Sequence, residues 1–231
     1  MTHSSLVISI IIPVLNEEKH IQTTLQAIER TPDIEIIVVD GGSTDHTVKL
    51  AKECNVIVIS ISQKGRARQM NAGAAIASGE ILLFLHADTR LPRGYAKMVR
   101  DTLTLPQTVA GAFALKIDGA MRSLRWVEKM VQWRSRFCSL PYGDQALFCK
   151  TSTFFELGKF PDLLFMEDFE FVRTLRKAGR IRIVPHAVLT SGRRWQKLGV
   201  VKTTAINQII IIGYFFGVSP HRLARWYRTF Q

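Results

Sequence analysis

The chain has 231 residues, of which 47% are apolar and 22% are charged, and its formal net charge is +12. This length and apolar content are sufficient for one sizeable hydrophobic core and exclude an intrinsically disordered chain. The three cysteines show no Cys-x-x-Cys spacing, so the sequence predicts neither a disulfide framework nor a structural zinc site, and it favours a reducing compartment.

The first apolar run covers residues 6–14 and is predicted to form a buried strand. Ser9 interrupts it, and Pro13 lies near its end. The residues before it contain neither a basic segment nor a small-residue cleavage site, which argues against a secretory signal. We therefore expect a cytoplasmic protein.

Three more short apolar runs follow, over residues 34–40, 56–61 and 80–88. Polar segments of helical length separate them, with a helix-start residue at Asn16 and a helix-end glycine at Gly79. Each run is continuously apolar rather than alternating, which is typical of strands that are covered on both sides. The pattern predicts an α/β fold with a mostly parallel central sheet and helices on both faces.

The periodicity changes after residue 92. In chain order, the pattern there predicts a helix over 95–103, a strand over 109–117, a helix over 121–137, a helix over 168–178 and a strand over 180–184. No internal repeat or low-complexity linker separates these elements from the first part of the chain. We therefore expect a single domain over residues 1–231.

The excess positive charge lies at the C-terminal end. Residues 171–231 hold twelve of the 31 Lys and Arg residues and no Asp or Glu, so residues 1–170 carry 19 residues of each sign. Such a block can bind nucleic acid, anionic lipid headgroups or an acidic substrate, and it can also be a solvated basic face. Charge alone does not choose between these alternatives.

A long apolar segment, residues 203–218, lies within this basic block. Its uninterrupted apolar run is about half of the roughly 20 residues that span a bilayer as a helix. Its apolar residues occur all around a helix, which predicts a core or subunit contact first and a place in a membrane interface second. The residues that favour the interface are the aromatic and basic ones that follow, namely His221, Arg222, Arg225, Trp226, Tyr227 and Arg228.

Polar residues follow each of the first four apolar runs. In open α/β sheets ligands bind beyond the carboxyl ends of the strands, so these positions are the first candidates for a site. They are Pro13, Asn16 and Glu17 after the first run, Asp40 to Asp45 after the second, Lys64 to Arg66 after the third, and His86, Ala87 and Asp88 after the fourth. Taken singly, each is equally well explained as a helix cap or a turn residue.

Together these motifs resemble the family 2 glycosyltransferases of the GT-A fold, over roughly residues 8–195. The matching segments are Ile12-Pro13, Asn16-Glu17, Asp40-Gly41-Gly42-Ser43-Thr44-Asp45, Asn71-Ala72-Gly73, Gly79, His86-Ala87-Asp88 and Glu167-Asp168. The resemblance implies a GT-A nucleotide-diphospho-sugar transferase fold and a nucleotide-sugar donor. It also implies a nucleotide-sugar-binding half over 1–92, an acceptor half over 93–200 and a basic, apolar C-terminal appendage over 201–231.

The resemblance further implies Mg²⁺ or Mn²⁺ as cofactor, with Asp88 as the carboxylate that meets the metal. Mg²⁺ and Mn²⁺ prefer oxygen ligands, and one carboxylate can suffice when phosphates and water complete the coordination. His86 stands where the family has the first Asp of Asp-x-Asp, and Gly41 replaces the second Asp of Asp-Asp, which leaves uridine and guanosine both open. His186 is expected to complete the metal site, as a His does in some relatives.

An inverting sugar transfer needs a base for the attacking hydroxyl, and the family's Glu-Asp pair implies Asp168 in that role. From the residues alone, Asp168 is equally a helix cap. The other expected substrate-binding residues are Pro13, Asn16, Glu17, Asp40, Arg66, Asn71, His86, Ala87, Gly143, Asp144, Arg193, Arg194 and Trp195. Among them, Arg66, Arg193 and Arg194 are expected to contact phosphate, and Trp195 to stack on a sugar.

The segments His86-Ala87-Asp88, Gly143-Asp144-Gln145 and Arg193-Arg194-Trp195 are similar to a bacterial subgroup associated with arsenosugar biosynthesis. This implies a small-molecule acceptor, with a lipid-linked acceptor as the alternative. An anionic membrane surface and a second copy of the chain are further candidate partners. The expected location is the cytoplasm, with peripheral association at the inner face of the membrane as an addition to it.

Three alternative functions are weaker. A nucleotidyltransferase needs a glycine-rich, basic triphosphate loop, and residues 13–17 are neither. A nucleic-acid-binding protein is disfavoured because the chain shows no recognisable module and no interleaved aromatic residues, so no nucleic acid is expected as a partner. A membrane-surface protein with a vestigial site is the third alternative, with His86 as the sign of decay.

Overall fold

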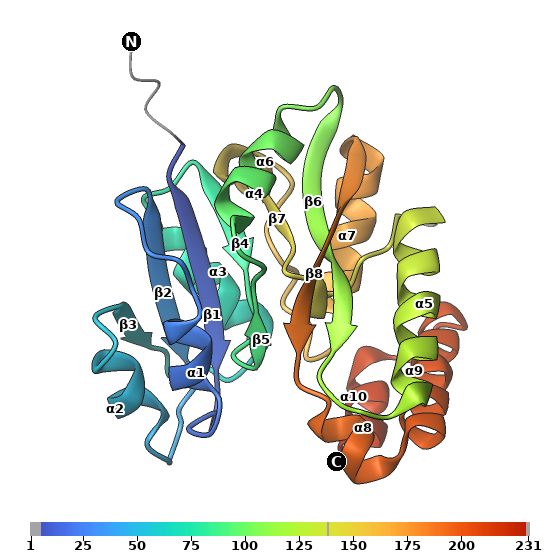
Figure 1. Cartoon of the computed structure of the whole chain (residues 1–231). Coiled ribbons are helices and arrows are strands. Elements are labelled where there is room, and N and C mark those ends of the chain that lie inside the picture. The colour runs from blue at the N-terminus through green and yellow to red at the C-terminus, as the bar shows by residue number, and fades with distance from the viewer. Residues whose placement is uncertain (1–5, 138, 230–231) are drawn as a thin grey trace.

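The computed structural model describes residues 6–137 and 139–229, in which helices cover both faces of an eight-stranded sheet (Figure 1). The strands are β1 (Ile8–Val14), β2 (Ile34–Asp40), β3 (Ile57–Ser60), β4 (Ile81–Phe84), β5 (Thr89–Arg90), β6 (Thr108–Ile117), β7 (Phe148–Lys150) and β8 (Arg180–Thr190). The helices are α1 (Ile21–Gln26), α2 (Thr47–Lys52), α3 (Arg66–Ile76), α4 (Tyr95–Leu103), α5 (Arg122–Phe137), α6 (Thr151–Glu156), α7 (Glu167–Ala178), α8 (Arg193–Leu198), α9 (Val200–Phe215) and α10 (Pro220–Thr229). A short 3₁₀ turn, η1, covers Gly143–Gln145.

The strand order is β3-β2-β1-β4-β7-β6-β8-β5. Parallel pairs join β3 to β2, β2 to β1, β1 to β4 and β6 to β8, whereas β7 and β5 run antiparallel to their neighbours. The predicted mostly parallel sheet with helices on both faces is therefore confirmed. Strands from before and after residue 92 belong to the same sheet, because β7 pairs with both β4 and β6. The predicted division of the chain into two halves and an appendage stays a prediction.

Alternate residues of each central strand enter two different cores, which explains the continuously apolar runs. Ile8, Ile10 and Ile12 of β1 pack with α1, α2, α4 and α5 on one face of the sheet. Ile11 of the same strand packs with α3, α6 and α7 on the other face. A strand that is buried on both sides needs apolar residues at successive positions, and here helices pack on both faces of the sheet.

Two of the predicted elements have different bounds in the structure. The first helix begins at Ile21 rather than near Asn16, because Asn16 has a left-handed backbone (φ 55°) and its side chain bonds the second loop instead. The last strand continues to Thr190, beyond the predicted end at residue 184. Its register against β6 shifts at Phe113/Ala114, so that Pro185 and His186 form a bulge.

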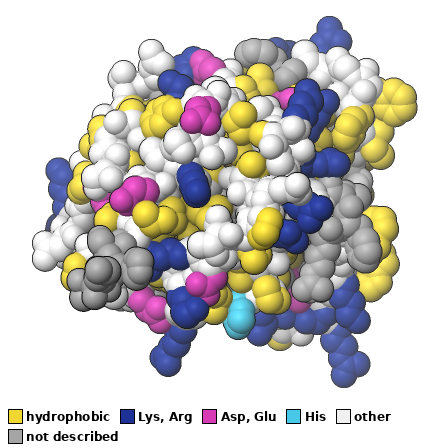
Figure 2. All heavy atoms as spheres, turned by 90° about the horizontal axis from the view of Figure 1, so that it is seen from above, with side chains coloured by type: hydrophobic (Ala, Val, Ile, Leu, Met, Phe, Trp, Pro, Cys, Tyr) yellow, Lys and Arg dark blue, Asp and Glu magenta, His cyan; other side chains and the backbone are white. Residues whose placement is uncertain are grey.

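The C-terminal helices pack on the rest of the chain through a third, smaller core. Its buried members are Met166, Phe169, Ile206, Ile210 and Leu223. In the described part of the chain, no helix is long and apolar enough to cross a bilayer. Figure 2 shows hydrophobic and basic side chains gathered along the right edge of the molecule, the side on which Figure 1 places α5 and α9.

Candidate functional site

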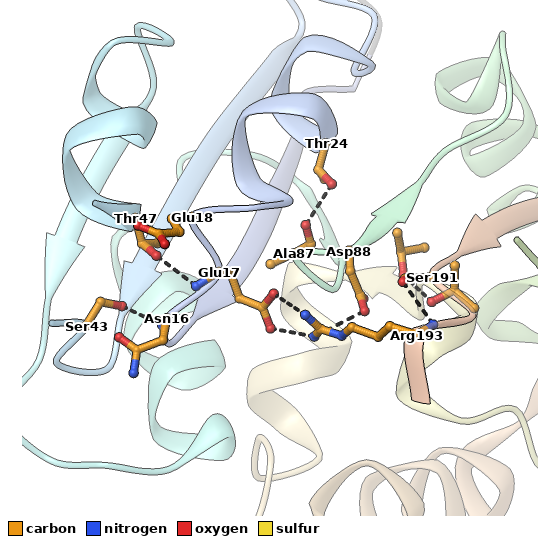
Figure 3. A network of polar contacts seen from close by, with 12 residues as sticks. Asn16, Glu17, Glu18, Thr24, Ser43, Thr47, Ala87, Asp88, Ser191 and Arg193 are labelled. Atoms are coloured by element: carbon orange, nitrogen blue, oxygen red, sulfur yellow. Dashed lines mark hydrogen bonds and ion pairs between the residues drawn. The ribbon is translucent and has the colours of Figure 1, made fainter. Parts of the chain in front are cut away.

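The loops after β1 and β2 are fastened to each other at the carboxyl edge of the sheet (Figure 3). Asn16 donates its backbone N–H to Ser43 Oγ at 2.9 Å, and its Oδ1 accepts the Thr44 N–H at 2.9 Å. The Glu17 N–H donates to Thr47 Oγ1 at 2.8 Å. The Asn-Glu motif thus first of all fixes the relative position of two loops.

Asp40, at the end of β2, is buried and shapes its own turn. Its carboxylate accepts the N–H groups of Gly42 at 3.1 Å and Ser43 at 3.0 Å. Gly42 has φ 94°, a left-handed conformation that favours glycine. The Asp40 carboxylate therefore holds the loop, and its expected contact with the substrate stays a prediction.

Gln69 of α3 fills the space beside Gly41, where the family has a second Asp. A Cβ on Gly41 would lie 3.0 Å from the Gln69 side-chain amide. The buried Gln69 Nε2 donates to the carbonyls of Val14 and Val39, both at 2.8 Å. Gln69 was not among the expected site residues, because a glutamine within a helix carries no signal that its side chain will bond to the ends of two strands.

The segment after β4 is held by its backbone on both sides. Thr24 Oγ1 donates to the Ala87 carbonyl at 2.7 Å, and the Ser191 N–H donates to the Asp88 carbonyl at 3.1 Å. Ala87 is buried. The Asp88 side chain is therefore carried on a fixed backbone, and Thr24 and Ser191 are positioning residues that the sequence did not reveal.

Arg193, at the start of α8, joins Glu17 and Asp88 (Figure 3). Its Nη1 and Nη2 atoms donate to the two carboxylate oxygens of Glu17 at 2.8 and 2.7 Å. Its Nη2 also lies 3.3 Å from Asp88 Oδ2. Burial raises the pKa of Asp88, and the Arg193 guanidinium offsets part of that rise.

The donor set at this point fits a divalent ion only in part. In the ranges that the structure describes, no group of three His, Cys, Asp or Glu side chains could hold a metal. The Asp88 and Glu17 carboxylates nevertheless face the same cation, so the location attracts positive charge. Mg²⁺ and Mn²⁺ commonly take one or two carboxylates and complete their shell with phosphate oxygens and water, which this pair allows.

His186 does not join this location, contrary to the expectation that it completes a metal site. It is exposed in the bulge of β8, four residues before Thr190. Thr190 pairs with Thr89, which is next to Asp88. Four residues of strand correspond to about 13 Å, so the imidazole lies well away from the Asp88 carboxylate.

Asp168, Gly143 and His86 meet on the other side of the site. Asp168 Oδ2 accepts the Gly143 N–H at 2.8 Å. A Cβ on Gly143 would lie 3.0 Å from Asp168 Oδ2 and 3.1 Å from His86 Nε2, so the two side chains close over the glycine. A small pocket is lined by Arg66, Met70, Phe84, His86, Gly143, Leu147, Phe160 and Asp168. Asp168 therefore lies in the first turn of α7 but also belongs to this pocket.

Arg66, the first residue of α3, forms an ion pair with the buried Glu167 beside Asp168. The sequence predicted a phosphate contact for Arg66, and the structure gives this guanidinium a carboxylate partner. Burial and the nearby Arg66 charge lower the pKa of His86 to about 3, so its imidazole is neutral near pH 7. A neutral imidazole can donate one hydrogen bond and accept another.

Asp144 of η1 lies deeper in the same region. Burial raises its pKa to about 6, although the Arg134 guanidinium opposes the rise. Its Oδ1 atom is buried and has no hydrogen-bond partner among the residues that the structure describes. Arg134 itself stacks on the Tyr142 ring, 3.5 Å from its centroid.

Three expected substrate-binding residues have other surroundings. Asn71 is bonded through its amide to the backbone of Phe160, donating at 2.8 Å and accepting at 3.1 Å. Trp195 packs against the first core, rather than standing free to stack on a sugar. Pro13 lies within β1 opposite Val39. The side chain of Arg194 falls outside the described part of the structure.

A model of the family described as Glycosyl transferase family 2 matches residues 9–160 of the chain. Glycosyltransferase AglE of Haloferax volcanii is 36% identical over 98 residues, which cover 38% of this chain and 32% of that protein. The chain thus spans about a third of the length of the curated relatives named first among its matches.

Two solved structures share the arrangement of the chain. S. aureus TarS 1–349 in complex with UDP has a TM-score of 0.66 and 20% identity, covering 80% of this chain and 60% of that one. The mannosyltransferase PcManGT from Pyrobaculum calidifontis in complex with GDP-Man and Mn²⁺ has a TM-score of 0.67 and 19% identity, covering 89% of this chain and 65% of that one. At these identities the likeness concerns the fold.

Proposed function

The chain belongs to glycosyl transferase family 2 and has the GT-A fold, and from this premise we propose an inverting, divalent-metal-dependent transfer of a sugar from a nucleotide-diphosphate donor to an acceptor hydroxyl. The enzyme is a glycosyltransferase. The observation that carries the proposed mechanism is a pair of carboxylates in two different surroundings: Asp88 lies 3.3 Å from the Arg193 guanidinium, and Asp168 lines the small pocket together with His86. One serves the leaving diphosphate and the other serves the attacking hydroxyl.

The donor binds beyond the carboxyl ends of β1, β2 and β4, the general location for ligands of such sheets. The loops held together by Asn16 and Asp40 form its floor. Arg193 contributes a guanidinium whose two-pronged geometry suits phosphate as well as the Glu17 carboxylate. Binding of the diphosphate would therefore exchange one anionic partner of Arg193 for another.

Asp88 would hold the metal ion, with the diphosphate oxygens as further ligands. A bound Mg²⁺ or Mn²⁺ would offset the charge that develops on the departing diphosphate. Asp88 is mostly buried and fixed through its carbonyl, which favours one orientation of its carboxylate. The preference between Mg²⁺ and Mn²⁺ would depend on the nucleotide-sugar whose phosphate oxygens complete the coordination shell of the metal.

Asp168 would take the proton from the acceptor hydroxyl as that oxygen attacks the anomeric carbon. The Gly143 N–H donates a hydrogen bond to Oδ2 of the Asp168 carboxylate. The ion pair with Arg66 holds Glu167, the residue before Asp168. The neutral His86 lies on the same pocket and can donate a hydrogen bond to the sugar without adding charge. These groups orient the base against the face opposite the leaving group.

The nucleotide stays open between uridine and guanosine. TarS is described with UDP and PcManGT with GDP-Man, and Gly41 with Gln69 replaces the family carboxylate that would distinguish them. We propose a small molecule as the acceptor, in line with the resemblance to the arsenosugar-associated subgroup, with a lipid-linked acceptor as the alternative.

The donor is tested by thermal unfolding with UDP-, GDP- and dTDP-sugars, each with and without Mn²⁺. A ligand that binds only the folded protein stabilises it by about 2.7 kcal/mol when present at about a hundred times its dissociation constant. We expect one nucleotide to raise the melting temperature, and to do so more strongly with Mn²⁺. If no nucleotide-sugar shifts the transition in either condition, the proposed donor site is wrong.

A further inference from the structure

Helix α9 carries apolar side chains on the side that points away from the protein. Its inner side is already occupied, since Thr203, Ile206 and Ile210 are buried and the two isoleucines belong to the third core. In the described structure, its exposed large apolar residues are Val201, Ile209, Ile212 and Phe215, and the exposed Phe216 directly follows its last residue. Val201 and Phe216 are 84% and 85% exposed, so the fold of this chain does not use them.

Helix α5, which packs against α9, adds a second exposed stripe. Trp126, Met130 and Trp133 follow at positions i, i+4 and i+7 and therefore share one side of the helix. Trp126 is 66% and Trp133 is 62% exposed. Helix α10, which packs on α9, adds Trp226 at 56%. We call these exposed apolar residues of α5, α9 and α10 the outer surface.

The charges around the outer surface are almost all positive. Helices α8, α9 and α10 contain no acidic residue, and α5 contains only Glu128. Glu128 is neutralised within the fold, because it accepts the Ile117 N–H at 2.6 Å and pairs with Arg125 at 3.1 Å. The exposed cations of these helices include Arg122, Lys129, Lys202, Arg222 and Arg225.

We propose that the outer surface docks on the surface of an anionic lipid bilayer, with its helices lying in the plane of the interface. Exposed Trp side chains prefer the headgroup level of a bilayer, and Lys and Arg are attracted to anionic headgroups. An amphipathic helix that lies in the interface needs no spanning length, and no described helix has one. This inference is independent of the proposed transfer chemistry.

A second copy of the chain is a poorer occupant on charge grounds. In a two-fold dimer the same surface faces itself, so the exposed cations of both copies would be brought together. Like charges placed opposite each other are repulsive, and an apolar contact would have to overcome that repulsion. An anionic bilayer meets both the apolar and the cationic character of the outer surface.

The test is co-sedimentation of the full chain with vesicles of phosphatidylcholine alone and of phosphatidylcholine with an equal part of phosphatidylglycerol. We expect binding to the mixed vesicles, weakened by high salt, and at least about tenfold weaker binding to the neutral ones. The double variant I212Q/F216Q should lose about tenfold or more of the affinity. The double variant K202E/R222E should lose a similar amount while keeping the apolar residues.

The matched control is I76Q/L105Q, which removes two exposed apolar residues outside the outer surface and should bind like the original chain. Circular dichroism confirms that each variant is folded. Equal vesicle binding by I212Q/F216Q overturns the proposal. An absence of binding to the mixed vesicles also overturns it. If the original chain does not bind these vesicles but forms a dimer in analytical ultracentrifugation, and I212Q/F216Q abolishes that dimer, the outer surface is a subunit interface instead.

Discussion

Arg193 forms two hydrogen bonds with Glu17, a residue 176 positions earlier in the chain, at 2.8 and 2.7 Å. The same guanidinium lies 3.3 Å from the Asp88 carboxylate. One cation therefore connects the loop after β1, the segment after β4 and the start of α8. It lies where the proposed mechanism requires the diphosphate and the metal, so its removal is the most direct test of that location.

Replacing Arg193 by Ala should lower kcat/KM by about a hundredfold or more, because a positioned donor to developing negative charge is lost. R193K keeps the positive charge but lacks the planar pair of donors, so its kcat/KM should lie between that of the original enzyme and that of R193A. The measurement is initial-rate kinetics of nucleotide release with the donor found by thermal unfolding. K197A, an exposed cation of the same helix, is the control. Full activity of R193A would remove Arg193 from the mechanism.

Asp88 and metal dependence are tested together. EDTA should abolish transfer and added Mn²⁺ should restore it, since the ion offsets the charge on the leaving group. D88N should lose about a hundredfold or more in kcat and should not recover with excess Mn²⁺. D118N changes an exposed carboxylate elsewhere and should respond to EDTA like the original enzyme. Undiminished transfer in EDTA would contradict the proposed role of the metal.

The base is tested with D168N, which keeps the size of the side chain and removes its ability to accept a proton. Transfer should fall by about 10²- to 10⁴-fold, whereas the donor-induced shift in melting temperature should persist. E170Q, in the same turn of α7, is the matched control. If D168N transfers sugar at the original rate, another group is the base.

Asp144 makes stability depend on pH. Its folded-state pKa of about 6 lies above the ordinary value of 3.8. The resulting stabilisation of the folded state is complete below about pH 4 and is lost as the pH rises through about 6, where the buried carboxyl ionises. D144N cannot ionise, so its free energy of unfolding minus that of the original chain should be larger by about 1–3 kcal/mol at pH 8 than at pH 4, which means that D144N is relatively more stable at pH 8.

Urea unfolding of D144N at the two pH values measures this difference. D162N supplies the control, because the hydrogen bond from Arg68 lowers the pKa of Asp162, an exposed residue. The stabilisation from Asp162 is already present at about pH 4 and is lost only at lower pH, so the stability of D162N relative to the original chain should change little between the two pH values. If the stability of D144N relative to the original chain is the same at pH 4 and pH 8, Asp144 is not held in a desolvated site.

Gly73 is the glycine of the Asn-x-Gly motif, and the structure explains it by packing. A Cβ there would lie 2.6 Å from Ile11 Cγ2 and 3.0 Å from Val39 Cγ2, so α3 would have to move off the sheet. G73A should lower the free energy of unfolding by about 1–3 kcal/mol. A75S, on the exposed side of the same helix, should change it by less than about 0.5 kcal/mol. Equal stability of the two variants in urea would refute this account.

The sheet could be predicted where the strands are long and apolar, as in β1 and β2. The strands β5 and β7, with two and three residues, carry no periodic signal and were missed. Sequence motifs indicated one edge of the sheet, and the structure brings several of their residues together there, because residues after parallel strands converge. The contact between Arg193 and Glu17 could not be predicted, since only the closed fold brings them together.

The same limit explains the residues whose surroundings differ from the prediction. His186 follows an apolar run like the other expected site residues, but a bulge in β8 and four residues of strand separate it from Asp88. Arg66 and Asn71 have the polar character of ligand-binding groups, yet their partners are Glu167 and the Phe160 backbone. A single sequence shows which groups can bind, whereas the fold decides what they meet.

The two backbone bonds that hold the segment after β4 have a thermodynamic consequence. Thr24 fixes the Ala87 carbonyl and Ser191 fixes the Asp88 carbonyl. The conformational entropy of this segment is therefore lost once, when the chain folds, and not again each time a donor arrives. In the proposed mechanism, a carboxylate on such a preorganised backbone would let a location with few protein ligands still favour one geometry for a bound ion.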